Sequence, residues 1–218
     1  MLQTIIQDTS GAPDAAVIWL HGLGADGADF VDAVPYLNLP ASLKIRFVFP
    51  SAPVRAVTIN NGLQMRSWYD IKAMLPRRVT DERQLQESVQ QVSQLVEELI
   101  GQGIDAARII LVGFSQGGAV AYELALTGER NVSGVAAMST YMPRELSAED
   151  YTAVPSLNIL AIHGDADDVV PCALGESAVT ALQQFGFSVR WQTFPMAHEV
   201  TLPSLTLLGD WIAKQLTS

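Results

Sequence analysis

A serine stands in a turn of small residues that directly follows an apolar stretch. The motif around Ser115 reads GFSQG, and the apolar stretch before it covers Arg108–Val112. A G-x-S-x-G turn between a strand and a helix holds its serine in a strained backbone conformation, so the residues two before and two after it must be small. Gly113 and Gly117 meet this need. The pattern predicts a nucleophilic serine at the end of a strand, with the backbone N–H of Gln116 directed toward a developing oxyanion.

A nucleophilic serine needs a base to take its proton and a carboxylate to hold that base in the correct tautomer. The chain contains three histidines, His21, His163 and His198. In hydrolases with this elbow the order along the chain is serine, acid, histidine, so only His163 and His198 could serve Ser115. The segment between Ser115 and His198 is long enough to contain the acid, so His198 is the predicted base.

The acid is expected in the loop after the apolar stretch Asn158–Ile162. This loop contains Asp165, Asp167 and Asp168, all within a few residues of the predicted strand end. Spacing and residue type favour none of the three over the others. The two that do not serve the base are expected to form turns or cap a helix.

A second oxyanion donor is expected from the loop after an early strand. The segment His21-Gly22-Leu23-Gly24 follows the apolar stretch Ala16–Leu20, and its glycines let the backbone approach a ligand closely. The backbone N–H of Leu23 is the predicted donor.

A zinc site built from the three histidines and nearby aspartates is an alternative, because imidazole and carboxylate are good zinc ligands. No tight ligand spacing supports that alternative. We therefore expect serine chemistry with neither a metal nor a cofactor.

Short apolar stretches between helical patterns predict an α/β fold in three layers, with a mostly parallel sheet and helices on both faces. The predicted strands are Ala16–Leu20, Arg46–Phe49, Arg108–Val112, Val132–Met138, Asn158–Ile162 and Val189–Phe194. The predicted helices are Asp29–Tyr36, Asp81–Ile100, Gln116–Leu126, Ala173–Phe185 and Leu202–Leu216. Thr80 is expected to cap the second of these helices. The length suits one domain over residues 1–218.

Two connections between these elements bear on the site. Pro50–Thr80 is too long for an ordinary loop, and its Asn60-Asn61-Gly62 turn predicts a hairpin at the carboxyl edge of the sheet, where it forms a wall of the substrate site. Thr140–Leu157 is long enough only for a loop and a helical turn, so no large lid is expected and the site should be open to solvent.

Four residues are candidates for substrate contact. Met65 and Trp68 lie in the long connection and either line an acyl pocket or pack the hairpin against the sheet. Val169 and Met196 flank the predicted acid and base along the chain.

The composition excludes some partners. A formal charge of −10 and a pI near 4.6 disfavour nucleic-acid binding, because phosphates would be repelled. The N-terminal segment lacks the basic start and apolar stretch of a secretory signal, and the apolar runs elsewhere suit buried strands, so a cytoplasmic protein without membrane insertion is expected. Cys172 is the only cysteine, which excludes an intrachain disulfide. A homodimer remains open.

Six separated blocks carry a resemblance that covers nearly the whole chain. In order they read WLHGLGAD, FVFPSAPVRAVTINNG, SWYDIKAM, GFSQGGAVA, HGDADDVVP and PMAHEV. The chain resembles the phospholipase/carboxylesterase family, which includes bacterial carboxylesterases and acyl-protein thioesterases. The resemblance implies an α/β-hydrolase fold and a triad of Ser115, Asp167 and His198. Ala197 is a departure, because many relatives carry glycine before the catalytic histidine.

The expected activity is that of a serine carboxylesterase that forms an acyl-enzyme. The absence of a large lid favours soluble short- to medium-chain acyl esters as the small-molecule substrates. Acyl-protein thioesterase or lysophospholipase activity would use the same chemistry. A catalytically silent, ligand-binding relative is an alternative of another class.

Overall fold

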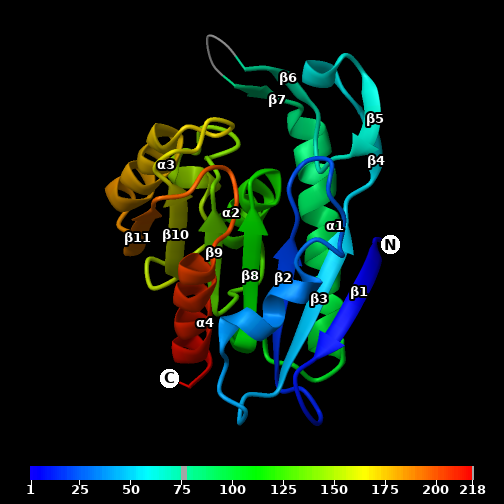
Figure 1. Cartoon of the computed structure of the whole chain (residues 1–218), viewed down its shortest axis with the longest axis vertical. Coiled ribbons are helices and arrows are strands. Elements are labelled where there is room, and N and C mark those ends of the chain that lie inside the picture. Colours follow the sequence, from blue (N-terminus) through cyan, green and yellow to red (C-terminus); the bar gives the residue numbers. More distant parts are fainter. Residues whose placement is uncertain (75–77, 218) are drawn as a thin grey trace.

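The computed structural model describes residues 1–74 and 78–217, and its centre is one seven-stranded sheet (Figure 1). The strand order is β1-β3-β2-β8-β9-β10-β11. The bounds are β1 Gln3–Asp8, β2 Ala15–Leu20, β3 Ile45–Ser51, β8 Ile109–Phe114, β9 Gly134–Met138, β10 Asn158–Gly164 and β11 Val189–Phe194. β1 runs antiparallel to β3, and all other neighbours in the sheet are parallel. The predicted α/β-hydrolase fold is confirmed.

Helices cover both faces of this sheet. α1 (Glu82–Gly101), α2 (Gln116–Thr127) and α3 (Cys172–Gln184) share one buried cluster, whereas η1 (Val31–Leu37) and α4 (Leu202–Thr217) share the other. β2 explains the two clusters, because alternate side chains of a strand point to opposite faces. Ala16, Ile18 and Leu20 belong to the first cluster. Ala15, Val17 and Trp19 belong to the second, so β2 is buried on both faces.

Three elements differ from the sequence prediction. β1 was not predicted, because its side chains are mostly exposed and it lacks the continuous apolar pattern of the buried strands. The helix expected at 29–36 is the 3₁₀ helix η1, which contains Pro35 and therefore lacks one backbone donor. Asp81 caps α1 in place of Thr80, since its carboxylate accepts the Gln84 N–H at 3.0 Å.

The connection over 50–80 forms the predicted hairpin. β4 (Val54–Val57) pairs antiparallel with β5 (Leu63–Arg66) around a turn in which Asn61 and Gly62 have positive φ. η2 (Thr58–Asn60) lies in the same turn, and β6 (Ile71–Ala73) pairs with β7 (Val79–Thr80). Residues 75–77 of the connection lie outside the described residues. Figure 1 shows both strand pairs beyond the carboxyl ends of the central strands.

The connection after β9 contains only the short helix η4 (Ala148–Asp150), so no large lid covers the sheet edge. Another short helix, η3 (Ala106–Arg108), precedes β8. Within residues 1–74 and 78–217, no helix is both long and apolar enough to cross a membrane.

Candidate active site

Four loops bring the predicted site residues to one edge of the sheet. Ser115 follows β8, Asp167 follows β10, His198 follows β11 and Leu23 follows β2. Because these strands are parallel, their carboxyl ends lie at the same edge, where open α/β sheets place ligands. The topology therefore explains why residues far apart in the sequence meet.

The turn at Ser115 has the geometry of a nucleophile elbow. Ser115 adopts φ 54° and ψ −120°, a strained conformation for a residue with a side chain, and its N–H donates to the Met138 carbonyl at 2.8 Å. A Cβ on Gly113 would clash with the Gly117 carbonyl oxygen. A Cβ on Gly117 would lie 2.5 Å from the carbonyl oxygen of His21. Both glycines are therefore required for strand, turn and helix to pack this closely.

Ser115, His198 and Asp167 form one hydrogen-bonded chain. His198 Nε2 lies 2.9 Å from Ser115 Oγ, and His198 Nδ1 lies 2.7 Å from Asp167 Oδ2. An ionised carboxylate only accepts, so Nδ1 carries the proton and Nε2 is free to accept from the serine hydroxyl. Ser115 is 8% exposed and Asp167 7%, which makes the pair of hydrogen bonds largely shielded from water.

The structure distinguishes among the three aspartates of the loop after β10. Asp167 Oδ1 accepts the backbone N–H groups of Val169 at 3.0 Å and Val170 at 2.8 Å, while Oδ2 is left for His198. Asp165 and Asp168 are exposed. Only the fold of the loop, which residue type does not reveal, selects the middle aspartate.

The His21 ring fixes the turn that follows β2. Its Nε2 accepts the Ala52 N–H at 3.0 Å, so Nδ1 carries the proton and donates to the Gly22 carbonyl at 2.6 Å. Burial lowers the pKa of His21 and thus favours this neutral form. In a trans peptide the N–H points opposite to the carbonyl, so the Leu23 N–H is held facing away from the His21 ring. A Cβ on Gly22 would lie 3.4 Å from Ser115 Cβ, so this turn lies against the serine.

The Gln116 side chain joins the elbow to the segment after β5. Its Oε1 accepts the Trp68 N–H at 2.8 Å and its Nε2 donates to the Tyr69 carbonyl at 2.6 Å. Trp68 Nε1 donates to the carbonyl of His21 at 2.9 Å. These links were not predicted, because they join segments almost fifty residues apart that share no spacing pattern.

The four predicted substrate contacts divide into two pairs. Trp68 is fully buried and Met196 is 3% exposed, each within one of the two clusters that cover the sheet. For Trp68 this burial favours packing of the hairpin against the sheet over lining of an acyl pocket, and Met196 likewise packs in the core. Met65 is half-buried beside the turn at Gly24, and Val169 is 52% exposed next to Asp167. Of the four, Met65 and Val169 remain candidates for substrate contact.

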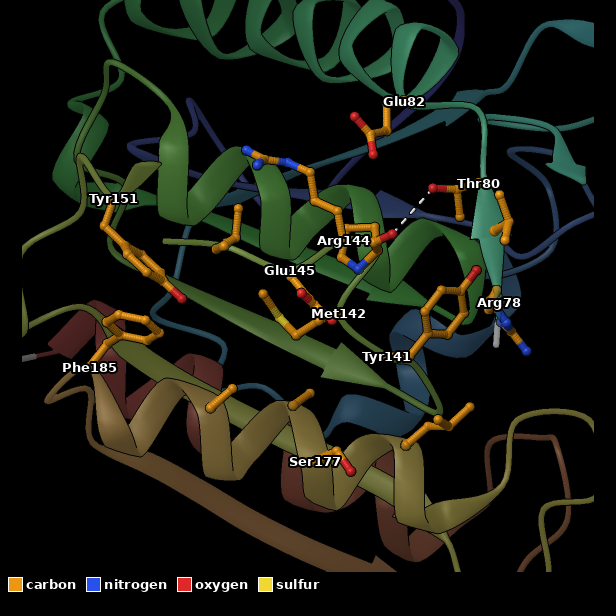
Figure 2. A pocket seen from close by; sticks show the side chains of 16 residues that line it. Arg78, Thr80, Glu82, Tyr141, Met142, Arg144, Glu145, Tyr151, Ser177 and Phe185 are labelled. Carbon is orange, nitrogen blue, oxygen red and sulfur yellow. Dashed lines mark hydrogen bonds between the residues drawn. The ribbon is translucent and has the colours of Figure 1, made fainter. Parts of the chain in front are cut away.

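A groove of about 670 Å³ lies between α3 and the loop after β9 (Figure 2). Ser115 does not line it, but Thr140, whose hydroxyl donates to the Ser115 carbonyl at 2.6 Å, is followed directly by Tyr141 of the groove wall. The apolar lining includes Met142, Leu174 and Phe185. Its polar lining consists of Arg78, Thr80, Glu82, Arg144, Glu145 and Ser177.

Two arginines shape this groove. Arg144 reaches the fully buried Glu123 of α2 at 2.8 Å and Asp150 at 3.2 Å, which anchors the loop after β9 on the helix that begins at the elbow. The Arg78 guanidinium lies 3.8 Å from the centre of the Tyr141 ring. The groove thus combines apolar surface with charge.

Across residues 1–74 and 78–217, no group of three or more His, Cys, Asp or Glu side chains has the arrangement of a metal site. Both ring nitrogens of His21 are hydrogen-bonded to backbone, so this ring presents no free lone pair to a metal.

Comparisons with known proteins agree with this fold. The sequence pattern of the family described as Phospholipase/Carboxylesterase matches residues 2–216. Acyl-protein thioesterase 1 of Mycosarcoma maydis is 36% identical over 96% of this chain and 95% of its own, and that of Neurospora crassa is 34% identical over 93% and 87%. The crystal structure of Zea mays acyl-protein thioesterase 2 is 25% identical with a TM-score of 0.84, covering 99% of this chain and all of that one.

Substitution of Gly113 by alanine tests the packing of the elbow. The added Cβ would meet the backbone of Gly117, so we expect Gly113→Ala to lower the free energy of unfolding by about 3 kcal/mol, measured by urea denaturation. Gly101→Ala is the control, because a Cβ there meets nothing within 4 Å. Equal stability of the two variants would contradict the proposed role of Gly113.

Proposed function

The chain belongs to the phospholipase/carboxylesterase family, and we propose that it hydrolyses acyl thioesters and acyl esters through an acyl-enzyme on Ser115. It is a hydrolase of the esterase and thioesterase type. The observation that carries the proposal is the hydrogen-bonded chain from Ser115 through His198 to Asp167. Serine, imidazole and carboxylate in this order match the needs of acyl transfer.

In the acylation half, His198 Nε2 takes the proton of Ser115 as Oγ attacks the acyl carbonyl. The Leu23 and Gln116 N–H groups donate to the oxyanion that develops on the carbonyl oxygen. Asp167 stabilises the imidazolium, which then protonates the departing thiolate or alkoxide. The products are a free thiol or alcohol and an ester of Ser115.

In the deacylation half, water takes the place of the leaving group. His198 removes a proton from this water as it attacks the Ser115 ester, and the same two amides hold the second oxyanion. His198 then returns the proton to Ser115 Oγ, which releases the carboxylic acid and regenerates the enzyme.

The identity of the leaving group is supported by the relatives. Proteins named acyl-protein thioesterase match almost the whole chain at 34–36% identity, which favours a thioester on a protein cysteine as the substrate. The carboxylesterase interpretation differs only in the leaving group, and the site without a large lid supports small soluble esters as a second substrate class.

The groove is the proposed binding place for the acyl chain of the substrate. It starts beside the residue that contacts the Ser115 carbonyl and runs along α3, with apolar surface from Met142, Leu174 and Phe185. Charged side chains interrupt this apolar surface, and burying their solvated groups under a long alkyl chain would be costly. This lining favours short to medium acyl chains over long ones.

The assignment of the acid is tested by two neighbouring substitutions. We expect Asp167→Asn to lower kcat by up to about 10⁴-fold, because the amide no longer holds His198 in the required tautomer. Asp168→Asn, in an exposed position, is the matched control and should retain nearly full activity with p-nitrophenyl butyrate. The opposite result would identify Asp168 as the residue that orients His198. Failure of a fluorophosphonate probe to label folded wild-type protein would instead favour a catalytically silent, ligand-binding relative.

The leaving group is tested with two peptides that differ only in cysteine or serine at the acylated position. Both carry an octanoyl group, and each rate is divided by the uncatalysed rate at the same pH. We expect the larger acceleration for the S-octanoyl peptide. A larger acceleration for the O-octanoyl peptide would favour the carboxylesterase interpretation, and Ser115→Ala should abolish both.

The place of the acyl chain is tested on α3. Ser177 lines the groove, whereas Thr180 lies outside the groove lining. The two residues are otherwise matched, because both are exposed and each hydroxyl donates to a backbone carbonyl one turn earlier. We expect Ser177→Trp to lower kcat/KM for p-nitrophenyl octanoate about tenfold while that for the acetate stays unchanged. Thr180→Trp should affect neither ester. A uniform loss with both esters would place the acyl chain elsewhere.

A further inference from the structure

His163 is a buried imidazole that the reaction described above does not use. It lies at the penultimate position of β10 and is 1% exposed. Its Nε2 lies 2.8 Å from the Val170 carbonyl oxygen and 3.6 Å from Asp167 Oδ2. Because a carbonyl only accepts, Nε2 carries the proton and donates to Val170.

This hydrogen bond is one part of a network centred on Asp167. Val170 receives the His163 N–H at its carbonyl and donates its own N–H to Asp167 Oδ1 at 2.8 Å. The other carboxylate oxygen accepts from His198 at 2.7 Å. The position of Val170 therefore depends on His163, and the orientation of the carboxylate depends on Val170.

We propose that His163 is a positioning residue that holds the loop after β10 so that the Asp167 carboxylate faces His198. The inference rests on the proposed function, in which Asp167 orients the catalytic base. His163 acts only through Asp167 and Val170.

The packing around His163 restricts movement of the ring. A Cβ on Gly175 of α3 would clash with the ring at Nδ1, so the helix lies directly against the imidazole. The Trp191 ring of β11 lies 5.9 Å away between centroids. A ring enclosed by a helix, a neighbouring strand and its own loop is a rigid support for Val170.

The charge state of His163 suits this role. The ionisable groups that face it are Asp167 in its own loop, His198 after β11 and Glu176 on α3. Burial lowers the pKa of His163 and outweighs the opposing effects of the hydrogen bond to Val170 and of the charges on Asp167 and Glu176. A neutral His163 ring still donates to Val170. Because it carries no charge, it does not compete with the His198 imidazolium for the Asp167 carboxylate.

Two substitutions separate positioning from packing. His163→Phe keeps a planar ring but removes the donor, whereas His163→Gln keeps an N–H that can reach the Val170 carbonyl. We expect His163→Phe to lower kcat about 10- to 100-fold with little change in KM, because the triad is misaligned. His163→Gln should recover most of this loss. Rates are measured with p-nitrophenyl butyrate and divided by the concentration of sites titrated with a fluorophosphonate, so that unfolded protein does not count.

The pH profile gives a second readout that loss of stability would not move. The Asp167 carboxylate stabilises the imidazolium that His198 becomes during the reaction, and the pH profile of kcat/KM reports on this coupling. Misplacing the carboxylate weakens the coupling, so the acidic limb of the kcat/KM profile should differ from wild type in His163→Phe and return toward wild type in His163→Gln. An unchanged limb and an unchanged kcat per titrated site in His163→Phe would overturn the proposal, as would equal defects in both variants.

A spectroscopic readout separates this proposal from the proposed function. The low-field proton resonance of the His198–Asp167 hydrogen bond is recorded without substrate. We expect it to be shifted or lost in His163→Phe and restored in His163→Gln, even if wild-type protein fails to hydrolyse the ester. Failure of wild-type turnover would overturn the proposed function, and an unaltered resonance in His163→Phe would overturn the role of His163.

Discussion

The close packing of Gly113 against Gly117 is the constraint on which the site depends. Without side chains at these positions, β8 can turn directly into α2, and Ser115 is held at a positive φ with its hydroxyl toward His198. The absence of a Cβ on Gly117 also lets the start of α2 approach the carbonyl of His21. One contact between two glycines thus brings the proposed nucleophile and both expected oxyanion amides into the same small volume. The other catalytic groups only have to reach that volume from neighbouring strands.

The three histidines share a side-chain type but differ in the groups that surround them. His198 lies between a hydroxyl and a carboxylate, so both of its nitrogens face groups that exchange or stabilise a proton. His21 and His163 each donate to a backbone carbonyl within a buried setting that lowers the pKa. The two buried rings are therefore neutral hydrogen-bond donors that fix the turns bearing Leu23 and Asp167. Only His198 faces the Ser115 hydroxyl, and this contact is why the proposed proton transfer is placed on this ring.

Much of the fold could be predicted, because strands buried on both faces leave continuous apolar stretches such as β2. Ser115 and His198 could be predicted from the elbow motif and the order of residues along the chain. The choice of Asp167 over Asp165 and Asp168 needed the family resemblance, since it depends on which carboxylate receives the amides of the loop. The sequence left Trp68 open between two interpretations, because an aromatic residue in a connection looks the same in sequence whether it contacts substrate or fills a core. The exposed edge strand β1 lacked any apolar pattern to reveal it.

The side chain of Gln116 links the segment that follows the β4–β5 hairpin to the turn that bears Ser115. Its bonds to Trp68 and Tyr69 tie the segment after β5 to the first residue of α2, so this segment cannot swing away without breaking buried hydrogen bonds. Opening of the molecule at this segment would therefore have to break the bonds of Gln116 first. The exposed tip of the hairpin, with Leu63 at 62% exposure, lies outside these bonds and is free to vary. A substitution at the tip therefore changes the outer surface of the hairpin without touching the hydrogen bonds that hold the turn at Ser115.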